Sequence, residues 1–189
     1  MINILVDKLP TEYKGLKINT NFRPFILFEL LMQDNTINES EKIFIALNIF
    51  FEEEIKDIKK AIDCILWFYS RGKNKENNNS NEKNLKSKKS KMIYSYETDA
   101  DLIYSAFLDQ YNIDLNEIDY LHWFKFKAMF EGLKDDNKIC EVMGYRAINI
   151  NNIKDEKERK KYRKLQEEWA LPDNRSDKEK ENDFANSLW

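Results

Sequence analysis

His122 is the residue of this sequence best suited to acid–base chemistry, because it is the single histidine and imidazole titrates near neutral pH. If the surrounding segment is helical, Asp119 lies one turn before it. Di-iron helical bundles need two Glu/His pairs, however, and one histidine does not supply them. A nucleophilic triad also needs a poised serine or cysteine, and no serine here stands in an elbow-like sequence. We therefore interpret His122 as a hydrogen-bonded histidine at the edge of the core.

Two groups of acids resemble metal-binding patterns, and a helix start explains each of them. Asp99 and Asp101 superficially match a chelating pair, but no third ligand is in view, and both fit the first turn of a helix capped by Thr98. The acids at 52–54, together with Asp57, are interpreted as the charged start of another helix. The sequence therefore predicts no metal site, no cofactor and no enzymatic activity.

The two cysteines and the hydropathy pattern indicate the compartment. Cys64 and Cys140 lie among apolar neighbours, which favours buried free thiols over a disulfide or a nucleophile. The best apolar run, residues 43–51, contains Asn48 and is too short to span a membrane. The N-terminus lacks the basic start of an export signal. We therefore expect a reducing compartment and no membrane partner.

Helices must position these residues, because only 4 glycines and 3 prolines interrupt 189 residues. Hydrophobic spacing and capping residues predict helices at 22–34, 38–51, 54–69, 98–110, 119–133, 137–144 and 155–171. Residues 1–20 alternate weakly and fit either a short β-hairpin or a loop. The expected fold class is all-α, a compact multi-helix bundle of six to seven helices, with that N-terminal hairpin as an optional addition.

Charge divides the chain into an acidic body and one basic segment. Residues 71–91 carry eight Lys/Arg and two acids among Asn and Ser, so they have net charge +6, whereas the whole chain carries −3 and the other 168 residues carry −9. The composition predicts a disordered insertion in a single helical domain of residues 1–171. Because an acidic body repels phosphate, a nucleic-acid role would depend on this segment alone and is not favoured.

Three predicted helices have no polar face. At 100° per residue, the apolar side chains of residues 120–130 point in nearly every direction, and residues 22–32 and 43–51 look the same. Such helices lie either at the centre of a bundle or against other copies, and we expect a homo-oligomer. Candidate protein-interaction residues from this segment are Tyr120, Trp123, Phe126 and Phe130.

Residues 172–189 form a C-terminal tail in which capping-box spacing predicts one short helix. That helix would carry Phe184 and Leu188 on one face, with Trp189 as the last residue. Because a helix of this length is marginal in water without support, we count these three residues as further protein-interaction candidates.

Five sequence blocks resemble the "gene product fifteen" family of long-tailed bacteriophages. They occur in the same order over most of residues 1–172, at 18–23, 28–34, 99–107, 120–126 and 143–146. The lysine-rich insertion is not part of that pattern. The resemblance implies a non-enzymatic tail-morphogenesis protein similar to the tail assembly chaperones, which coat the tape-measure helix, help to recruit tail-tube subunits and are absent from the finished virion.

The resemblance thus implies the tape-measure protein and the tail-tube protein as partners, in the cytoplasm of the host bacterium. Two other functions stay open at this point: a minor structural protein of the tail, and a nucleic-acid-binding accessory protein that uses residues 71–91.

Overall fold

The computed structural model of the chain describes residues 2–73 and 92–173. Within these ranges it has seven α-helices and one two-stranded hairpin, so the expected all-α fold is confirmed, and so is the hairpin as its N-terminal addition. The disorder expected at 71–91 falls almost entirely outside these ranges. The tail helix with Phe184, Leu188 and Trp189 also lies outside the described residues, and the division into domains stays a prediction.

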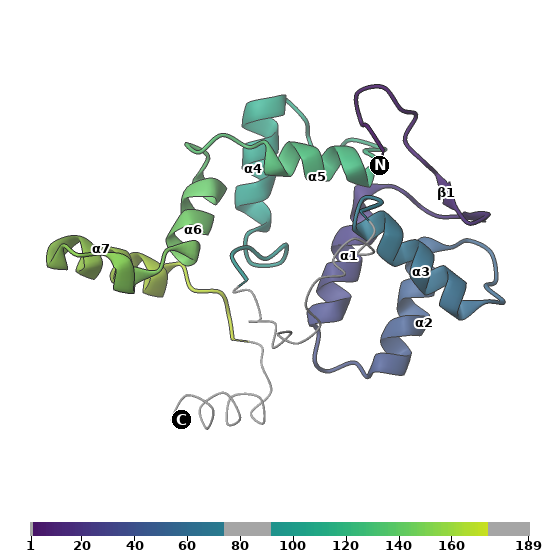
Figure 1. Cartoon of the computed structure of the whole chain (residues 1–189), viewed down its shortest axis with the longest axis horizontal. Helices are drawn as coiled ribbons and strands as arrows, with labels where there is room; N and C mark the ends of the chain where they lie inside the picture. Colours follow the sequence, from purple (N-terminus) through teal and green to yellow (C-terminus); the bar gives the residue numbers. More distant parts are fainter. Residues whose placement is uncertain (1, 74–91, 174–189) are drawn as a thin grey trace, which may run out of the picture.

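The elements follow one another in the order seen in Figure 1. They are β1 (Glu12–Tyr13), β2 (Leu16–Lys17), α1 (Phe22–Gln33), α2 (Glu39–Phe50), α3 (Ile58–Tyr69), α4 (Ala100–Tyr111), α5 (Trp123–Glu131), α6 (Lys138–Ala147), the 3₁₀ turn η2 (Ile150–Asn152) and α7 (Glu156–Glu168). The hairpin is antiparallel, with Glu12 opposite Lys17.

Side-chain caps explain where several helices begin. The Asn38 side chain accepts a hydrogen bond from the Glu41 backbone N–H at 2.9 Å, as its capping-box spacing predicts. The carboxylate of Asp57 caps α3 in the same way at 3.0 Å. Because Asp57 caps α3, the residues at 54–57 precede the helix, and the start expected at residue 54 was wrong by one turn.

Three other expected boundaries were wrong. Residues 119–122 precede α5, which starts at Trp123. Asp99, and not Thr98, is the residue before α4, and its carboxylate makes no capping hydrogen bond because it is engaged with Arg146. Gly144 lies inside α6 and does not end it; a Cβ at this position would meet no atom within 4 Å, so an exposed glycine is tolerated there.

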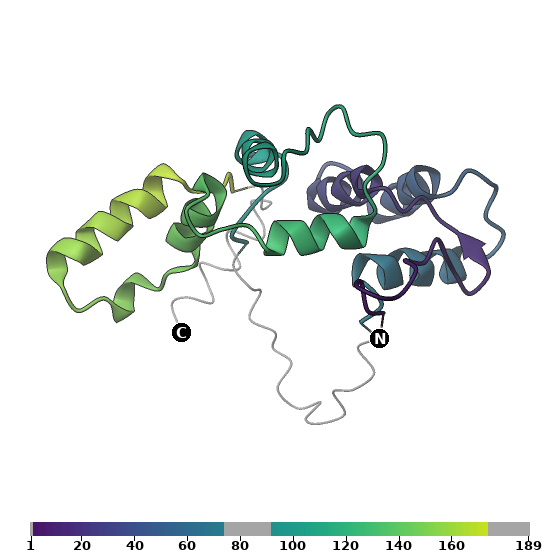
Figure 2. The same ribbon diagram turned by 90° about the horizontal axis from the view of Figure 1, so that it is seen from above.

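The helices form two groups connected by α5. In Figures 1 and 2, α1, α2, α3 and the hairpin lie at one side of the molecule, and α6 and α7 lie at the other, with α4 and α5 between them. Packing follows the same order, since α5 contacts both α1 and α4, α4 contacts α6, and α6 contacts α7. One cluster of buried side chains runs through α1 to α6.

A short backbone pairing fixes α5 against the start of α1. Asn21 and His122 form an isolated antiparallel bridge, in which Phe22 N–H donates to the Leu121 carbonyl at 2.9 Å and Trp123 N–H donates to the Thr20 carbonyl at 2.8 Å. The guanidinium of Arg23 adds hydrogen bonds to three carbonyls of the preceding loop, those of Leu115, Asn116 and Ile118. The entry into α5 is therefore held by residues a hundred positions earlier.

Candidate protein-interaction surface

His122 serves as the cap of α5 and lies buried. Its Nδ1 accepts a hydrogen bond from Phe124 N–H at 3.1 Å, so the proton of the neutral ring is on Nε2, which donates to the Pro10 carbonyl at 3.0 Å. Desolvation by burial lowers the pKa of His122, which keeps the ring neutral. The interpretation as a hydrogen-bonded core histidine is confirmed, whereas the helical turn expected between Asp119 and His122 is absent because α5 begins after both.

The other residue types capable of chemistry are dispersed. In residues 2–73 and 92–173, no three His, Cys, Asp or Glu side chains gather as a metal site would require. Cys64 is buried and Cys140 half-buried; both are free, and burial raises both thiol pKa values, that of Cys64 to about 11. No described helix combines the length and the hydropathy that crossing a membrane would demand.

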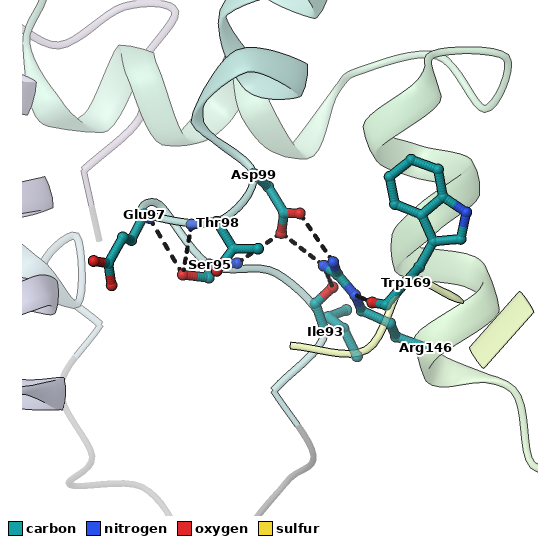
Figure 3. A network of polar contacts seen from close by, with 7 residues as sticks. All are labelled: Ile93, Ser95, Glu97, Thr98, Asp99, Arg146 and Trp169. Carbon is teal, nitrogen blue, oxygen red and sulfur yellow. Dashed lines mark hydrogen bonds and ion pairs between the residues drawn. The ribbon is translucent and has the colours of Figure 1, made fainter. Parts of the chain in front are cut away.

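Asp99 forms a buried ion pair with Arg146 of α6, which the sequence did not predict (Figure 3). The two guanidinium nitrogens lie 2.6 and 2.9 Å from the two carboxylate oxygens, and the same carboxylate accepts from Ser95 N–H at 2.9 Å. Arg146 also donates to the carbonyls of Ile93 and Trp169, at 3.1 and 2.6 Å. This network joins the segment before α4, helix α6 and the end of α7, which is a structural role.

The predicted interaction residues of α5 lie in the core. Trp123 and Phe126 are fully buried and stacked, with ring centroids 5.7 Å apart, and Phe130 is buried beside them. Trp123 also stacks on Phe25 of α1 at 4.8 Å. These three residues contact the core, because α1 and α4 pack against α5.

Tyr120 is the one described candidate that reaches the surface. Its side chain is 52% exposed, and its hydroxyl forms a 2.7 Å hydrogen bond with the Thr20 hydroxyl. It borders an open trough of about 960 Å³ between the hairpin and the loop that connects α2 to α3. The acids at 52–54 lie in that loop and are exposed, so they do not start a helix as expected.

Among the described helices, α1, α2 and α3 carry most of the exposed large apolar side chains, and Leu5 and Val6 of the N-terminal segment are more exposed still, at 88% and 79%. Phe44 of α2 is 67% exposed, Leu27 of α1 is 50% exposed, and Leu66 of α3 is 49% exposed. On α3, Ile58 and Ile62 precede Leu66 at intervals of four residues, which places all three on one face. Part of this surface could be found from the sequence, since residues 22–32 and 43–51 lack a polar face; which side chains stay uncovered depends on the packing.

The fold and this surface define a class of protein: an all-α chain whose helices leave apolar side chains in solvent. The model of one protein family, described as Bacteriophage Gp15 protein, matches residues 5–171. The chain therefore belongs to the bacteriophage Gp15 family and is a phage-related protein. The comparison with curated proteins and the comparison with solved structures each gave no match.

The blocks that carry the family resemblance pair in space. Block 18–23 forms the antiparallel bridge with block 120–126. Block 99–107 supplies Asp99 to the ion pair whose arginine comes from block 143–146. Four of the five blocks thus build the contacts that hold the helices together, and their residues are explained by the fold before any function is considered.

Proposed function

We propose that this protein is a tail assembly chaperone-like protein that binds the tape-measure protein during phage tail morphogenesis. It works as a homo-oligomer, without catalytic activity and without a cofactor, in the cytoplasm of the host bacterium. Tail-tube protein is its second partner, and the protein is absent from the finished virion. Family membership supports the phage setting of this proposal.

The single observation that carries the proposal is the apolar side chains left in solvent on α1, α2 and α3. A protein that covers a long helix with an apolar stripe needs exposed apolar surface of its own, because such a stripe is bound by helix-in-groove contacts. It also needs several copies, since each covers a short length of the client and linked sites bind with avidity. Leu27, Phe44 and Leu66 provide this kind of surface on three helices.

Co-purification tests the proposal. The chain is expressed with a tagged fragment of the phage's tape-measure protein and, as the control, with a tagged capsid protein of the same phage. We expect the chain to be retained by the tape-measure fragment alone and to be undetectable by mass spectrometry in purified virions. Retention in virions without binding to the tape-measure fragment would identify a structural protein of the tail and would contradict the chaperone role.

A further inference from the structure

Helix α2 presents the most exposed aromatic side chain of the described residues over an apolar hollow. Phe44 is 67% exposed, and it borders a shallow space of about 370 Å³ that is lined by Ile37, Ser40, Glu41 and Ile45 as well. These residues recur at helical spacing, so they belong to one side of α2 and its lead-in. We call this set of five residues the α2 face.

Exposed acids lie beside the α2 face at the N-terminal end of the helix. The chain from residue 34 to residue 54 contains six acids and a single basic residue, Lys42. Five of these acids, at 39, 41 and 52–54, are exposed at the two ends of α2, whereas Asp34 is half-buried. Glu41 itself lines the hollow. The acids at 52–54 share an open trough with Lys17, Lys56 and Lys60, so the acidic rim of the α2 face is at the N-terminal end of the helix.

The lone basic side chain of this stretch pairs with Glu39 and is not itself presented to a partner. Lys42 is buried, and its ammonium group points back to the end of α1, where it donates to the Met32 carbonyl at 3.3 Å and lies 3.5 Å from the Glu39 carboxylate. The Lys42 ammonium therefore has its partners inside the fold. The exposed residues of α2 are acidic, polar or apolar.

We infer that the α2 face binds an amphipathic helix of another protein whose bulky apolar side chains are flanked by Lys or Arg. This rests on the proposed function and specifies its site and the chemistry of its client. Phe44 supplies the apolar contact over the hollow. Glu41, which lines the hollow, and the exposed Glu39 select for basic flanks, because opposite charges at the rim of an apolar contact raise the association rate and reject acidic partners.

Two synthetic peptides of about 20 residues test the inference, since that length supports a helix in water. Both carry the same Leu stripe, and they differ in having Lys or Glu beside it. With the full chain, we expect the Lys peptide to bind at least about tenfold more tightly in fluorescence anisotropy, with a preference that shrinks as salt is added. Equal affinities would overturn the inference.

Variants locate the binding. Phe44→Ser is expected to weaken the Lys peptide at least about tenfold, as truncation of a central aromatic contact does. Glu41→Lys should reduce the preference for the Lys peptide.

Leu108→Ser is the matched control, because Leu108 is 41% exposed on α4, and this change should alter neither the affinity nor the preference. Circular dichroism confirms that each variant folds, and a misfolded Phe44→Ser is replaced by Phe44→Leu, which keeps an apolar residue but loses the ring. Equal loss with the control variant would overturn the inference.

The outcome separates this inference from the proposed function. If the tape-measure fragment still co-purifies with the Phe44 and Glu41 variants, the proposed function stands and the α2 face is not its site. If the fragment never binds but the peptide preference holds, the α2 face stands and the client is different. If Phe44→Ser instead lowers the mass of the protein on its own in light scattering, a second copy occupies the face and the inference is wrong.

Discussion

At the scale of single residues, His122 illustrates how a side chain suited to catalysis serves the fold instead. Its two nitrogens have fixed partners, Phe124 N–H and the Pro10 carbonyl, and the contact with Phe124 requires the neutral ring, whereas the bond to Pro10 does not. Protonation of Nδ1 would remove the acceptor that caps α5. Burial, which lowers the pKa of His122, and the cap at the start of α5 therefore both favour the neutral ring.

We predict that His122 makes stability depend on pH. Because its pKa in the folded chain lies below the ordinary value, the unfolded chain takes up the proton first as pH falls. The contribution of His122 is thus complete above pH 6.5 and is lost as pH falls from there through the folded-state pKa. Urea unfolding at pH 7.5, 6.5 and 5.5 should show a decreasing free energy of unfolding in this range.

The control is His122→Asn, which keeps a side-chain acceptor favoured at a helix start but does not titrate. Its free energy of unfolding should vary less over the same pH range. Glu29 acts in the opposite direction: burial raises its pKa, so its contribution is lost as pH rises through that pKa. Only the difference between wild type and variant therefore reports on His122, and identical pH dependence in the two would contradict the prediction.

Residue-scale sequence reasoning found the role of His122 but not that of Trp123. A histidine without catalytic neighbours is safely interpreted as structural, because catalysis needs several groups. Trp123 lies in a segment that is apolar on all sides, and periodicity states only that such a segment must be covered. Whether another helix or another subunit covers it depends on distant residues such as Phe25, whose position follows from the complete fold.

At the scale of elements, the sequence predicted each described α-helix but not the 3₁₀ turn η2, and its other errors lie at helix ends. The start of α5 was placed too early because Tyr120 and Leu121 continue the apolar pattern, although the backbone on either side of His122 pairs with residues 20 and 22. Asp99 was read as a favourable charge near a helix start, whereas it is paired with Arg146. No local pattern could show that pair, because its members are 47 positions apart.

We predict that this pair is essential for the packing of α4 against α6. Arg146→Met leaves the Asp99 carboxylate buried without its partner and should cost about 3–5 kcal/mol in the free energy of unfolding. The double variant Asp99→Asn/Arg146→Met should lose less, since no buried charge remains. Both values come from urea unfolding at pH 7.

The matched control is Lys160→Met, which breaks an exposed ion pair with Glu156 on α7. Exposed pairs contribute little, so the unfolding curve should hardly move. A loss in Arg146→Met as small as in this control would show that the buried network is dispensable.

At the scale of the whole molecule, large apolar side chains of α1, α2 and α3 are left exposed to solvent. We predict self-association through the α3 stripe of Ile58, Ile62 and Leu66, which would leave the α2 face for the client. Light scattering after gel filtration at micromolar concentration should give a mass well above 22.8 kDa. The variant Ile58→Ser/Leu66→Ser should shift that mass toward the monomer, because each change removes apolar area from the contact.

Leu108→Ser on α4 is again the control and should leave the mass unchanged. A monomer in the wild-type protein would contradict the prediction. A mass that Ile58→Ser/Leu66→Ser does not change would place the contact between copies on another surface.

The bridge between Asn21 and His122 has a consequence for synthesis on the ribosome. The start of α1 reaches its final contacts only when the loop that receives Arg23 and the first residues of α5 have been translated, a hundred residues later. At about 5–20 residues per second this takes about 5–20 s, during which Phe22 and Phe25 lack the aromatic rings that cover them. During this interval the first helices of the nascent chain expose apolar side chains that the finished fold buries, and they are then prone to aggregation.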